Sequence, residues 1–368
     1  MNFYSLIILR YFFMLDKFLW AENAMEVKVI CHNLSGTGGT ETVLVKVLNH
    51  LSKFHNIQLV LPNKPDNTEW LHNLDSNIQV RMLNKNGKLS KIMFFLKTFL
   101  KTTDDTVLLM LGANMIKFAA KVREVFHKKY GIISWIHFSL FDQQMFDPKN
   151  IRYADQHWAI STKISKQLQS LGIPDSKIRL IYNPITPAKI LSADSEQKDV
   201  CHLVYIGRIQ FEGQKNLKEL FDALGKVHKP VFIDLYGAGA DVQRCQEYCK
   251  IIGIEKNVRW HGWVNDPWQE IESSPDAIVL SSRYEGLPMV MLEAASRGIP
   301  MIVSQFEGYT DILQENINGY SYAIGNSDQL AEKIDKLSGS NINAEQVVDS
   351  IKKFYENEYF ARLDKILS

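Results

Sequence analysis

Short apolar runs that alternate with helix-patterned segments constrain the fold of this chain more than any other feature. The first run is Val27–Cys31, the last is Met301–Val303, and segments with helical spacing such as Thr42–Leu51 separate most of them. Uninterrupted apolar runs of this length are typical of strands that are buried on both faces of a parallel sheet. The repeated strand–helix order therefore predicts an α/β architecture with doubly wound parallel sheets.

The expected strands form two series with a break between them. They are Val27–Cys31, Ile57–Leu61, Val107–Leu111, Ile132–Ile136, His157–Ile160 and Ile178–Tyr182, then His202–Ile206, Phe232–Tyr236, Val258–Trp260, Ala277–Leu280 and Met301–Val303. Prolines and a polar run interrupt the pattern between Asn183 and Val200. We therefore predict two Rossmann-like domains, residues 25–190 and 191–345, that face each other across a cleft. Residues 346–368 are expected to form a C-terminal helix, which can cross back to the N-terminal domain.

The length and the charge distribution are compatible with this division. The chain has 368 residues, enough for two domains with separate cores. Residues 25–190 carry 22 Lys and Arg against 12 Asp and Glu, whereas residues 191–368 carry 18 against 27. The basic half is expected to face an anionic partner, unless its charges are simply solvated. No recognised nucleic-acid module accompanies these charges, so nucleic acid is not expected as that partner.

The cysteines and the first residues bear on localisation. The four cysteines form neither a disulfide framework nor a zinc spacing, which indicates a reducing, cytoplasmic compartment. The apolar runs Tyr4–Leu9 and Tyr11–Leu15 are both shorter than the roughly 18 residues of a membrane-spanning helix. Met25 leads directly into the first expected strand. We predict that residues 1–24 lie outside the fold, as an extension or an upstream translation start.

Two glutamates flank a strand–loop–helix junction in the second half of the chain. Glu285 follows the apolar run Ala277–Leu280, Pro288 is placed at the first helical position, and Glu293 lies inside the expected helix. The free N–H groups at the start of a helix attract anions. A phosphate held there between two carboxylates suits a sugar nucleotide, although two solvated helix-end carboxylates would give the same spacing.

The pattern E-G-L-P-x5-E-A resembles the nucleotide-sugar site of retaining glycosyltransferases of family 4, which have the two-domain GT-B fold. The resemblance extends over about residues 27–360. It implies that Glu285 contacts the donor hexose, that Gly286 and Leu287 lie beside it, and that Glu293 contacts the ribose.

The same resemblance assigns two further loops to the donor. Arg208 and Lys215 follow the expected strand His202–Ile206. Two cations there can neutralise a diphosphate, or they can be ordinary surface bases. By resemblance, they are the diphosphate ligands that the family carries at these positions. Gly38 and Gly39 precede Glu41 in a loop that matches neither the dinucleotide fingerprint nor the P-loop. By resemblance, this glycine loop approaches the donor phosphates and sugar, whereas the residues alone are equally compatible with a tight turn.

Two more strand ends carry candidate residues. His137 ends the expected strand Ile132–Ile136; a histidine there is often a structural hydrogen-bonding residue, but in the family it sits beside the donor sugar. The segment Trp260–Asp266 is either a strand with a glycine turn or, by resemblance, a loop whose backbone near Val264 contacts the nucleotide base.

These residues imply a mechanism and a substrate class. We find no Asp-x-Asp motif, so no metal cofactor is expected, and Arg208, Lys215, Glu285 and His137 are the expected catalytic residues. The family likeness implies transfer with retention, by front-side attack and without a covalent intermediate. Four segments are most similar to the lipopolysaccharide 1,6-galactosyltransferases, which implies transfer of galactose from UDP-galactose to a glycan or lipid-linked saccharide. These segments are residues 38–41, 134–140, 207–215 and 266–269.

Alternatives remain for both activity and location. A sugar-nucleotide epimerase on the same scaffold, or a non-catalytic nucleotide-sugar-binding partner protein, would use a similar cleft.

Residues 86–103 and 117–129 interleave lysines with apolar side chains. This pattern is compatible with peripheral binding to the anionic inner face of the cell membrane, and also with ordinary core-facing helices that carry solvated lysines.

Overall fold

The computed structural model describes residues 24–31, 34, 36, 38–83, 87–141, 146–191, 200–337 and 342–367. The predicted extension at residues 1–24 therefore lies outside the described residues except for Ala24. Within the predicted junction between the domains, residues 192–199 also lie outside them.

The first half of the chain forms a parallel sheet of seven strands in the order β3-β2-β1-β4-β5-β6-β7. The strands are β1 (Glu26–Ile30), β2 (Asn56–Leu61), β3 (Gln79–Met82), β4 (Val107–Met110), β5 (Gly131–Ile136), β6 (Gln156–Ala159) and β7 (Ile178–Leu180). The helices are α2 (Gly39–Leu51), α3 (Lys88–Lys101), α4 (Ala113–Val125) and α5 (Thr162–Ser170), with the 3-10 turns η1 (Glu69–Asn73), η2 (Pro148–Tyr153) and η3 (Asp175–Lys177). The strand order reverses between β1 and β4, where a doubly wound sheet opens a binding crevice.

The second half forms a parallel sheet of six strands in the order β10-β9-β8-β11-β12-β13. The strands are β8 (Cys201–Ile206), β9 (Val231–Tyr236), β10 (Val258–Gly262), β11 (Ala277–Leu280), β12 (Met301–Ser304) and β13 (Gly319–Tyr322). The helices are α6 (Leu217–Leu224), α7 (Val242–Ile251), α8 (Pro267–Glu270), α9 (Met289–Ala295) and α10 (Ser327–Leu337), with η4 (Glu255–Asn257) and η5 (Tyr309–Asp311). The predicted fold class, two Rossmann-like α/β domains, is confirmed.

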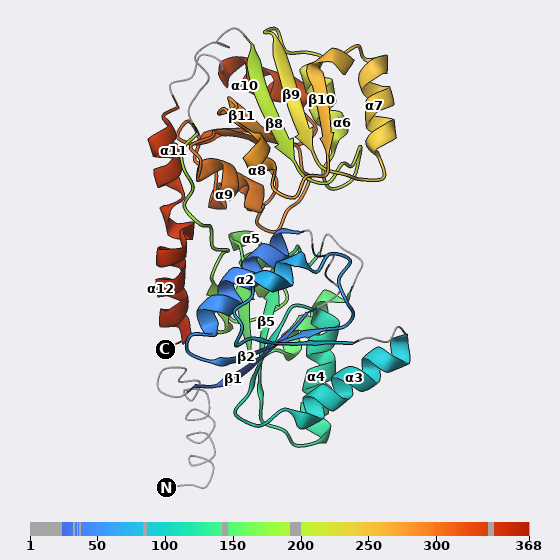
Figure 1. Cartoon of the computed structure of the whole chain (residues 1–368), viewed down its shortest axis with the longest axis vertical. Helices are drawn as coiled ribbons and strands as arrows, with labels where there is room; N and C mark the ends of the chain where they lie inside the picture. Colours follow the sequence, from blue (N-terminus) through green and yellow to red (C-terminus); the bar gives the residue numbers. More distant parts are fainter. Residues whose placement is uncertain are drawn as a thin grey trace.

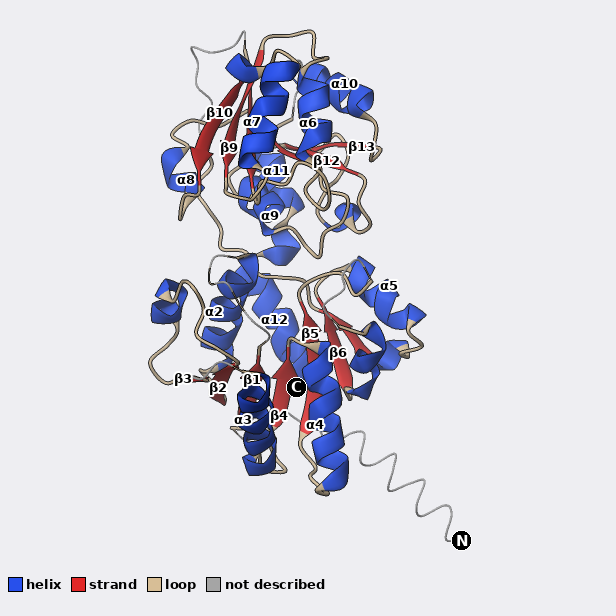
Figure 2. Cartoon of the chain, turned by 90° about the vertical axis from the view of Figure 1, so that its right-hand side faces the viewer, coloured by secondary structure: helices blue, strands red, loops and turns tan. Residues whose placement is uncertain are grey.

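The two domains lie one above the other in Figures 1 and 2. Helices α2 and α5 form the side of the N-terminal domain that faces the C-terminal domain, and α9 lies on the facing side of the latter. Pro288 is the residue before α9, so the prediction that it occupies the first helical position is wrong. None of the described helices combines the length and apolar character that crossing a membrane requires.

The last described segment connects the two domains. It comprises α11 (Ala344–Ser350), η6 (Lys352–Phe354) and α12 (Glu356–Leu367), which run along one side of the molecule in Figure 1. At Ile185, backbone hydrogen bonds join this segment to the chain that leaves β7. The single helix predicted for residues 346–368 is therefore two helices, because η6 and the extended Tyr355, which pairs with Ile185, separate them. Helix α12 then packs on α2, where His50 pairs with Asp364 at 2.7 Å.

Candidate functional site

A cleft of about 1110 Å³ lies between the domains, lined by loops at the carboxyl ends of β1, β5, β8, β9, β10 and β11. All ten residues that the sequence predicted for the site line it. They are Gly38, Gly39, His137, Arg208, Lys215, Val264, Glu285, Gly286, Leu287 and Glu293. The structure thus brings together residues that are separated by more than 200 positions in the sequence, from both domains.

Glu285 is the most tightly held carboxylate in the cleft. Its Oε1 accepts hydrogen bonds from Lys215 Nζ and from the hydroxyl of Ser282, each at 2.6 Å. Its Oε2 accepts a longer one, 3.4 Å, from Gln214 Nε2. The Glu285 side chain is 9% exposed, so these donors compensate the cost of burying its charge. The carboxylate is therefore fixed in one orientation.

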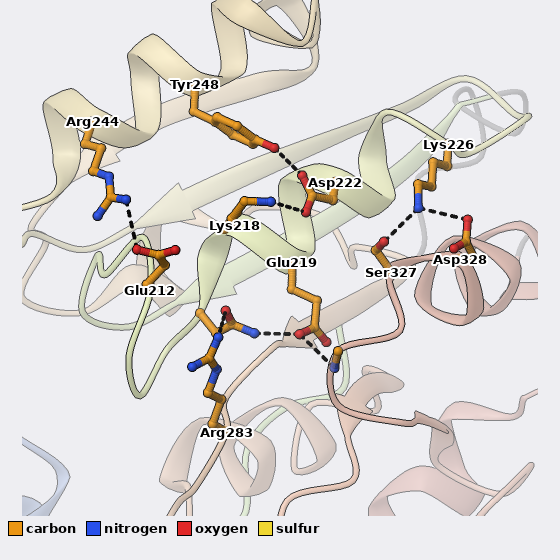
Figure 3. A network of polar contacts seen from close by, with 12 residues as sticks. Glu212, Lys218, Glu219, Asp222, Lys226, Arg244, Tyr248, Arg283, Ser327 and Asp328 are labelled. Carbon is orange, nitrogen blue, oxygen red and sulfur yellow. Dashed lines mark hydrogen bonds and ion pairs between the residues drawn. The ribbon is translucent and has the colours of Figure 1, made fainter.

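The turn that carries Lys215 is held by polar contacts of the next residue, Asn216, with Glu219 and Arg283, which are labelled in Figure 3. Asn216 adopts a left-handed conformation with φ of 50°, which an asparagine tolerates better than most residues. Its Nδ2 donates to Glu219 Oε2 at 2.6 Å, and its Oδ1 accepts a 3.3 Å hydrogen bond from Arg283. Glu219 also accepts from the backbone N–H of Gly325. This network sets the direction in which Lys215 leaves the backbone.

Arg208 lies two residues after the end of β8 and is exposed in the cleft. Its carbonyl oxygen accepts a 2.8 Å hydrogen bond from the hydroxyl of the buried Tyr205, which anchors the backbone of the loop. Among the described residues, no carboxylate forms an ion pair with its guanidinium. Arg208 therefore offers a cation on a fixed backbone to an anion in the cleft.

The N-terminal domain supplies the opposite wall. Glu41, in the first turn of α2, is buried and accepts a 2.7 Å hydrogen bond from the backbone N–H of Gly36, which closes the glycine loop. A Cβ on Gly39 would lie 3.0 Å from the side chain of Met289, in the other domain. A Cβ on Gly286 would lie 2.7 Å from the carbonyl oxygen of His137. The domains thus touch at glycines on both sides of the cleft.

The sequence did not identify the groups that hold the two glutamates. Ser282 and Gln214 hold Glu285, and Trp268 donates to Glu293 at 3.0 Å. Trp268 belongs to a motif that carried the family likeness, but without an assigned role. In the described part of the chain, no group of three or more His, Cys, Asp or Glu side chains is arranged to hold a metal ion.

Comparison with known proteins gives the family. Residues 190–360 match the family model of group 1 glycosyl transferases. The chain is 30% identical over 359 residues to the lipopolysaccharide 1,6-galactosyltransferase of Salmonella typhimurium LT2, and 30% identical over 357 residues to that of Escherichia coli K12. Both matches cover 93% of this chain and 98% of the relative.

Comparison with solved structures gives the same family. The apo structure of the lipopolysaccharide outer core galactosyltransferase WaaB superposes with a TM-score of 0.82 at 30% identity, covering 93% of this chain and 98% of that one. Two facing parallel-sheet domains with a cleft between them make up the GT-B fold. The chain belongs to the group 1 glycosyltransferases, and it is a transferase enzyme.

Proposed function

We propose that this enzyme is a retaining hexosyltransferase of family 4 that moves galactose from UDP-galactose onto a cell-surface glycan or lipid-linked saccharide. The observation that carries the proposal is the gathering of Glu285, Glu293, Arg208 and Lys215 in one interdomain cleft. The choice of donor and acceptor is supported by the similarity to two lipopolysaccharide 1,6-galactosyltransferases over nearly their whole length.

Each part of the donor has a partner in the cleft. Arg208 and Lys215 neutralise the diphosphate, and the loop of Gly38 and Gly39 approaches it from the other domain. The hexose hydroxyls bind Glu285, whose carboxylate is held by Lys215 Nζ and the Ser282 hydroxyl. At the far end, Glu293 accepts hydrogen bonds from the ribose, and backbone near Val264 contacts the base.

The chemistry follows from the charges. As the bond between the hexose C1 and the phosphate oxygen breaks, negative charge accumulates on the departing β-phosphate. Cations already in place at that oxygen stabilise the transition state more than the ground state. The acceptor hydroxyl attacks C1 from the same face and passes its proton to the departing phosphate oxygen, which retains the anomeric configuration. His137 lies beside the hexose, and Glu285 positions its hydroxyls and does not act as a nucleophile.

The proposed transfer needs no metal cofactor, because Arg208 and Lys215 supply the positive charge. Chelation of divalent cations is therefore expected to leave turnover unchanged. Purified protein is to be screened against UDP- and GDP-hexoses for donor hydrolysis and for transfer to saccharide acceptors. An isomerised sugar nucleotide without transfer would favour an epimerase instead, and binding without turnover would favour a non-catalytic partner protein.

Arg208→Ala tests the role of the cleft cation. We expect its kcat to fall at least about 100-fold, the loss typical of removing a preorganised transition-state donor. Arg259→Ala is the matched control, since Arg259 is an exposed arginine of the same domain that lies over Phe232 outside the cleft. Near-wild-type turnover of Arg208→Ala would refute the proposed mechanism.

We also propose that the N-terminal domain binds the anionic inner face of the cell membrane peripherally. Phe95 and Phe99 bury one face of α3, as core-facing helices do. However, Leu89, Ile92 and Met93 of the same helix are exposed, at 73%, 43% and 43%. The exposed side chains of α3 and α4 also include lysines, which are Lys88, Lys97, Lys101, Lys117 and Lys121.

Lipid vesicles test the membrane proposal. Lys97→Glu/Lys101→Glu is expected to weaken co-sedimentation with vesicles rich in anionic lipid, because each basic residue near such a surface contributes about 1 kcal/mol. Lys250→Glu/Lys256→Glu, on the exposed surface of the other domain, is the control. Co-sedimentation that does not respond to anionic lipid content would remove the proposal.

A further inference from the structure

The helical turn α8 supplies no group to the chemistry above, yet it contacts one of the cleft glutamates. Asp266 caps this turn, because its side chain accepts a 3.2 Å hydrogen bond from the backbone N–H of Trp268. The Trp268 side chain is buried, and its indole Nε1–H donates to Glu293 Oε2 at 3.0 Å. The capped turn therefore fixes an indole against a carboxylate that belongs to a different element, α9.

Arg297 holds the same indole from a second direction. Its guanidinium carbon lies 4.6 Å from the centroid of the Trp268 ring, a cation–π distance. Its Nη1 also donates to the carbonyl oxygen of Glu293 at 2.9 Å. The Trp268 side chain, carried by α8, is thus held by Glu293 of α9 and by Arg297 after α9, and its N–H has one fixed direction.

The two oxygens of Glu293 have different surroundings. Oε2 accepts the indole N–H, whereas among the described residues no group donates to Oε1. Because Glu293 lines the cleft, Oε1 is the acceptor that it offers to a ligand. Burial raises the pKa of Glu293, while the Trp268 hydrogen bond and the charge of Arg297 lower it. The other charges that act on this carboxyl are Asp266, which raises its pKa, and Lys46, which lowers it.

We propose that Trp268 is the positioning residue for Glu293, and that this pair makes the site selective for nucleotides with intact ribose hydroxyls. The inference rests on the proposed function, in which Glu293 faces the donor ribose. With Oε2 occupied by the indole, Oε1 is held where a ribose 2′- or 3′-hydroxyl donates to it. A hydrogen bond to a charged acceptor is the kind of contact whose loss discriminates strongly against a deoxy analogue.

The test compares ribonucleotides with their deoxy analogues. Binding of UDP against 2′-deoxy- and 3′-deoxy-UDP, and of GDP against its deoxy analogues, is measured by calorimetry in the full-length wild-type chain and in Trp268→Phe. Phenylalanine keeps a ring under Arg297 but lacks the N–H. Trp260→Phe is the matched control, because Trp260 of β10 packs on the other face of the same sheet, near Phe221.

For Trp268→Phe we expect about tenfold weaker nucleotide binding at neutral pH, and a preference for the ribonucleotide that falls to about twofold or less. The KM for the donor rises in parallel, while kcat stays within about threefold. Loss of the indole donor also raises the pKa of Glu293, so nucleotide binding in the variant weakens on acidification at a higher pH than in wild type. Trp260→Phe is expected to change none of these.

The outcomes separate the two proposals. Wild-type ribose preference and an unchanged pH profile in Trp268→Phe, with nucleotide binding intact, would overturn the role of Trp268 alone. Wild-type protein that binds neither UDP nor GDP would overturn the proposed function and the role of Glu293 with it. A lower melting temperature of Trp268→Phe with unchanged ribose preference would assign Trp268 to packing, and would also overturn the proposal.

Discussion

Replacing Gly286 with alanine adds one methyl group at a point where the two domains touch. The new Cβ would lie 2.7 Å from the carbonyl oxygen of His137 and 3.3 Å from Cα of Phe138. Both are backbone atoms of the other domain, so neither can rotate away as the end of a flexible side chain would. The φ of Gly286 is not among the positive values, and alanine therefore adopts this backbone without strain.

The magnitude follows from the overlap. Restoring an ordinary contact of 3.4 Å requires the domains to separate by about 0.7 Å at this point. Overpacking of this kind typically costs about 1–3 kcal/mol. Because that cost falls on the assembled cleft, we expect kcat/KM for donor transfer to fall about 10- to 100-fold, with each tenfold step equal to about 1.4 kcal/mol. The melting temperature should change little, since the domains can relieve the contact by opening.

Gly225→Ala is the control for this substitution. At Gly225, the residue after α6, the nearest atoms to an added Cβ lie 3.8 Å away and φ is −68°. Alanine there is expected to leave activity unchanged and to raise the free energy of unfolding by about 0.4–1 kcal/mol through the unfolded state. A Gly286→Ala enzyme with wild-type kcat/KM would refute the idea that close contact between Gly286 and His137 is needed for catalysis.

Two further substitutions test how the cleft is held. Ser282→Ala removes one hydrogen bond to the Glu285 carboxylate, and a hydrogen bond to a charged group typically contributes about 1.5–3 kcal/mol. We expect kcat to fall roughly 10-fold or more in steady-state assays. An unchanged kcat would contradict the role of Ser282 in positioning Glu285. Asp311 accepts a 2.8 Å hydrogen bond from the backbone N–H of Thr162 in the other domain, and burial raises its pKa. A raised folded-state pKa gives stability that is present at acid pH and lost as pH rises through that pKa. Urea unfolding should therefore show wild type gaining stability over Asp311→Asn from pH 7 to pH 4, and a difference independent of pH would contradict this.

The strands that the sequence failed to predict lack the aliphatic runs of the others. The edge strand β3 (Gln79–Met82) contains two polar residues and no fully buried one, because one of its sides pairs with no neighbour. At the far edge of the other sheet, β13 (Gly319–Tyr322) is buried but consists of glycine, serine and two tyrosines. Central strands are covered on both faces, and their composition therefore predicted them.

The residues of the candidate site also include some that the sequence predicted and some that it did not. Residues such as Glu285 and Arg208 could be predicted because loops at the carboxyl ends of parallel strands meet at one crevice, whatever the details of packing. The donors that orient the glutamates could not, since each hydrogen bond depends on a single side-chain direction, and Gln214 and Trp268 come from turns that are distant in the sequence. Trp268 is the clearest case: its contact with Glu293 requires both the Asp266 cap and the clamp by Arg297.

The ion pair between Lys215 and Glu285 limits what one substitution at either position can reveal. Lys215 Nζ lies 2.6 Å from Glu285 Oε1, and the side chains of Lys215 and Glu285 are 20% and 9% exposed. Lys215→Met therefore leaves the nearly buried Glu285 carboxylate without its counter-ion, which costs about 3–5 kcal/mol of the free energy of unfolding. Adding Glu285→Gln removes that charge and should restore much of the free energy of unfolding. In the proposed chemistry, the lysine also neutralises the diphosphate, so the double variant should turn over at least about 100-fold more slowly than Glu285→Gln alone. Equal turnover of the two would mean that Lys215 serves as the counter-ion of Glu285 and has no role at the phosphates.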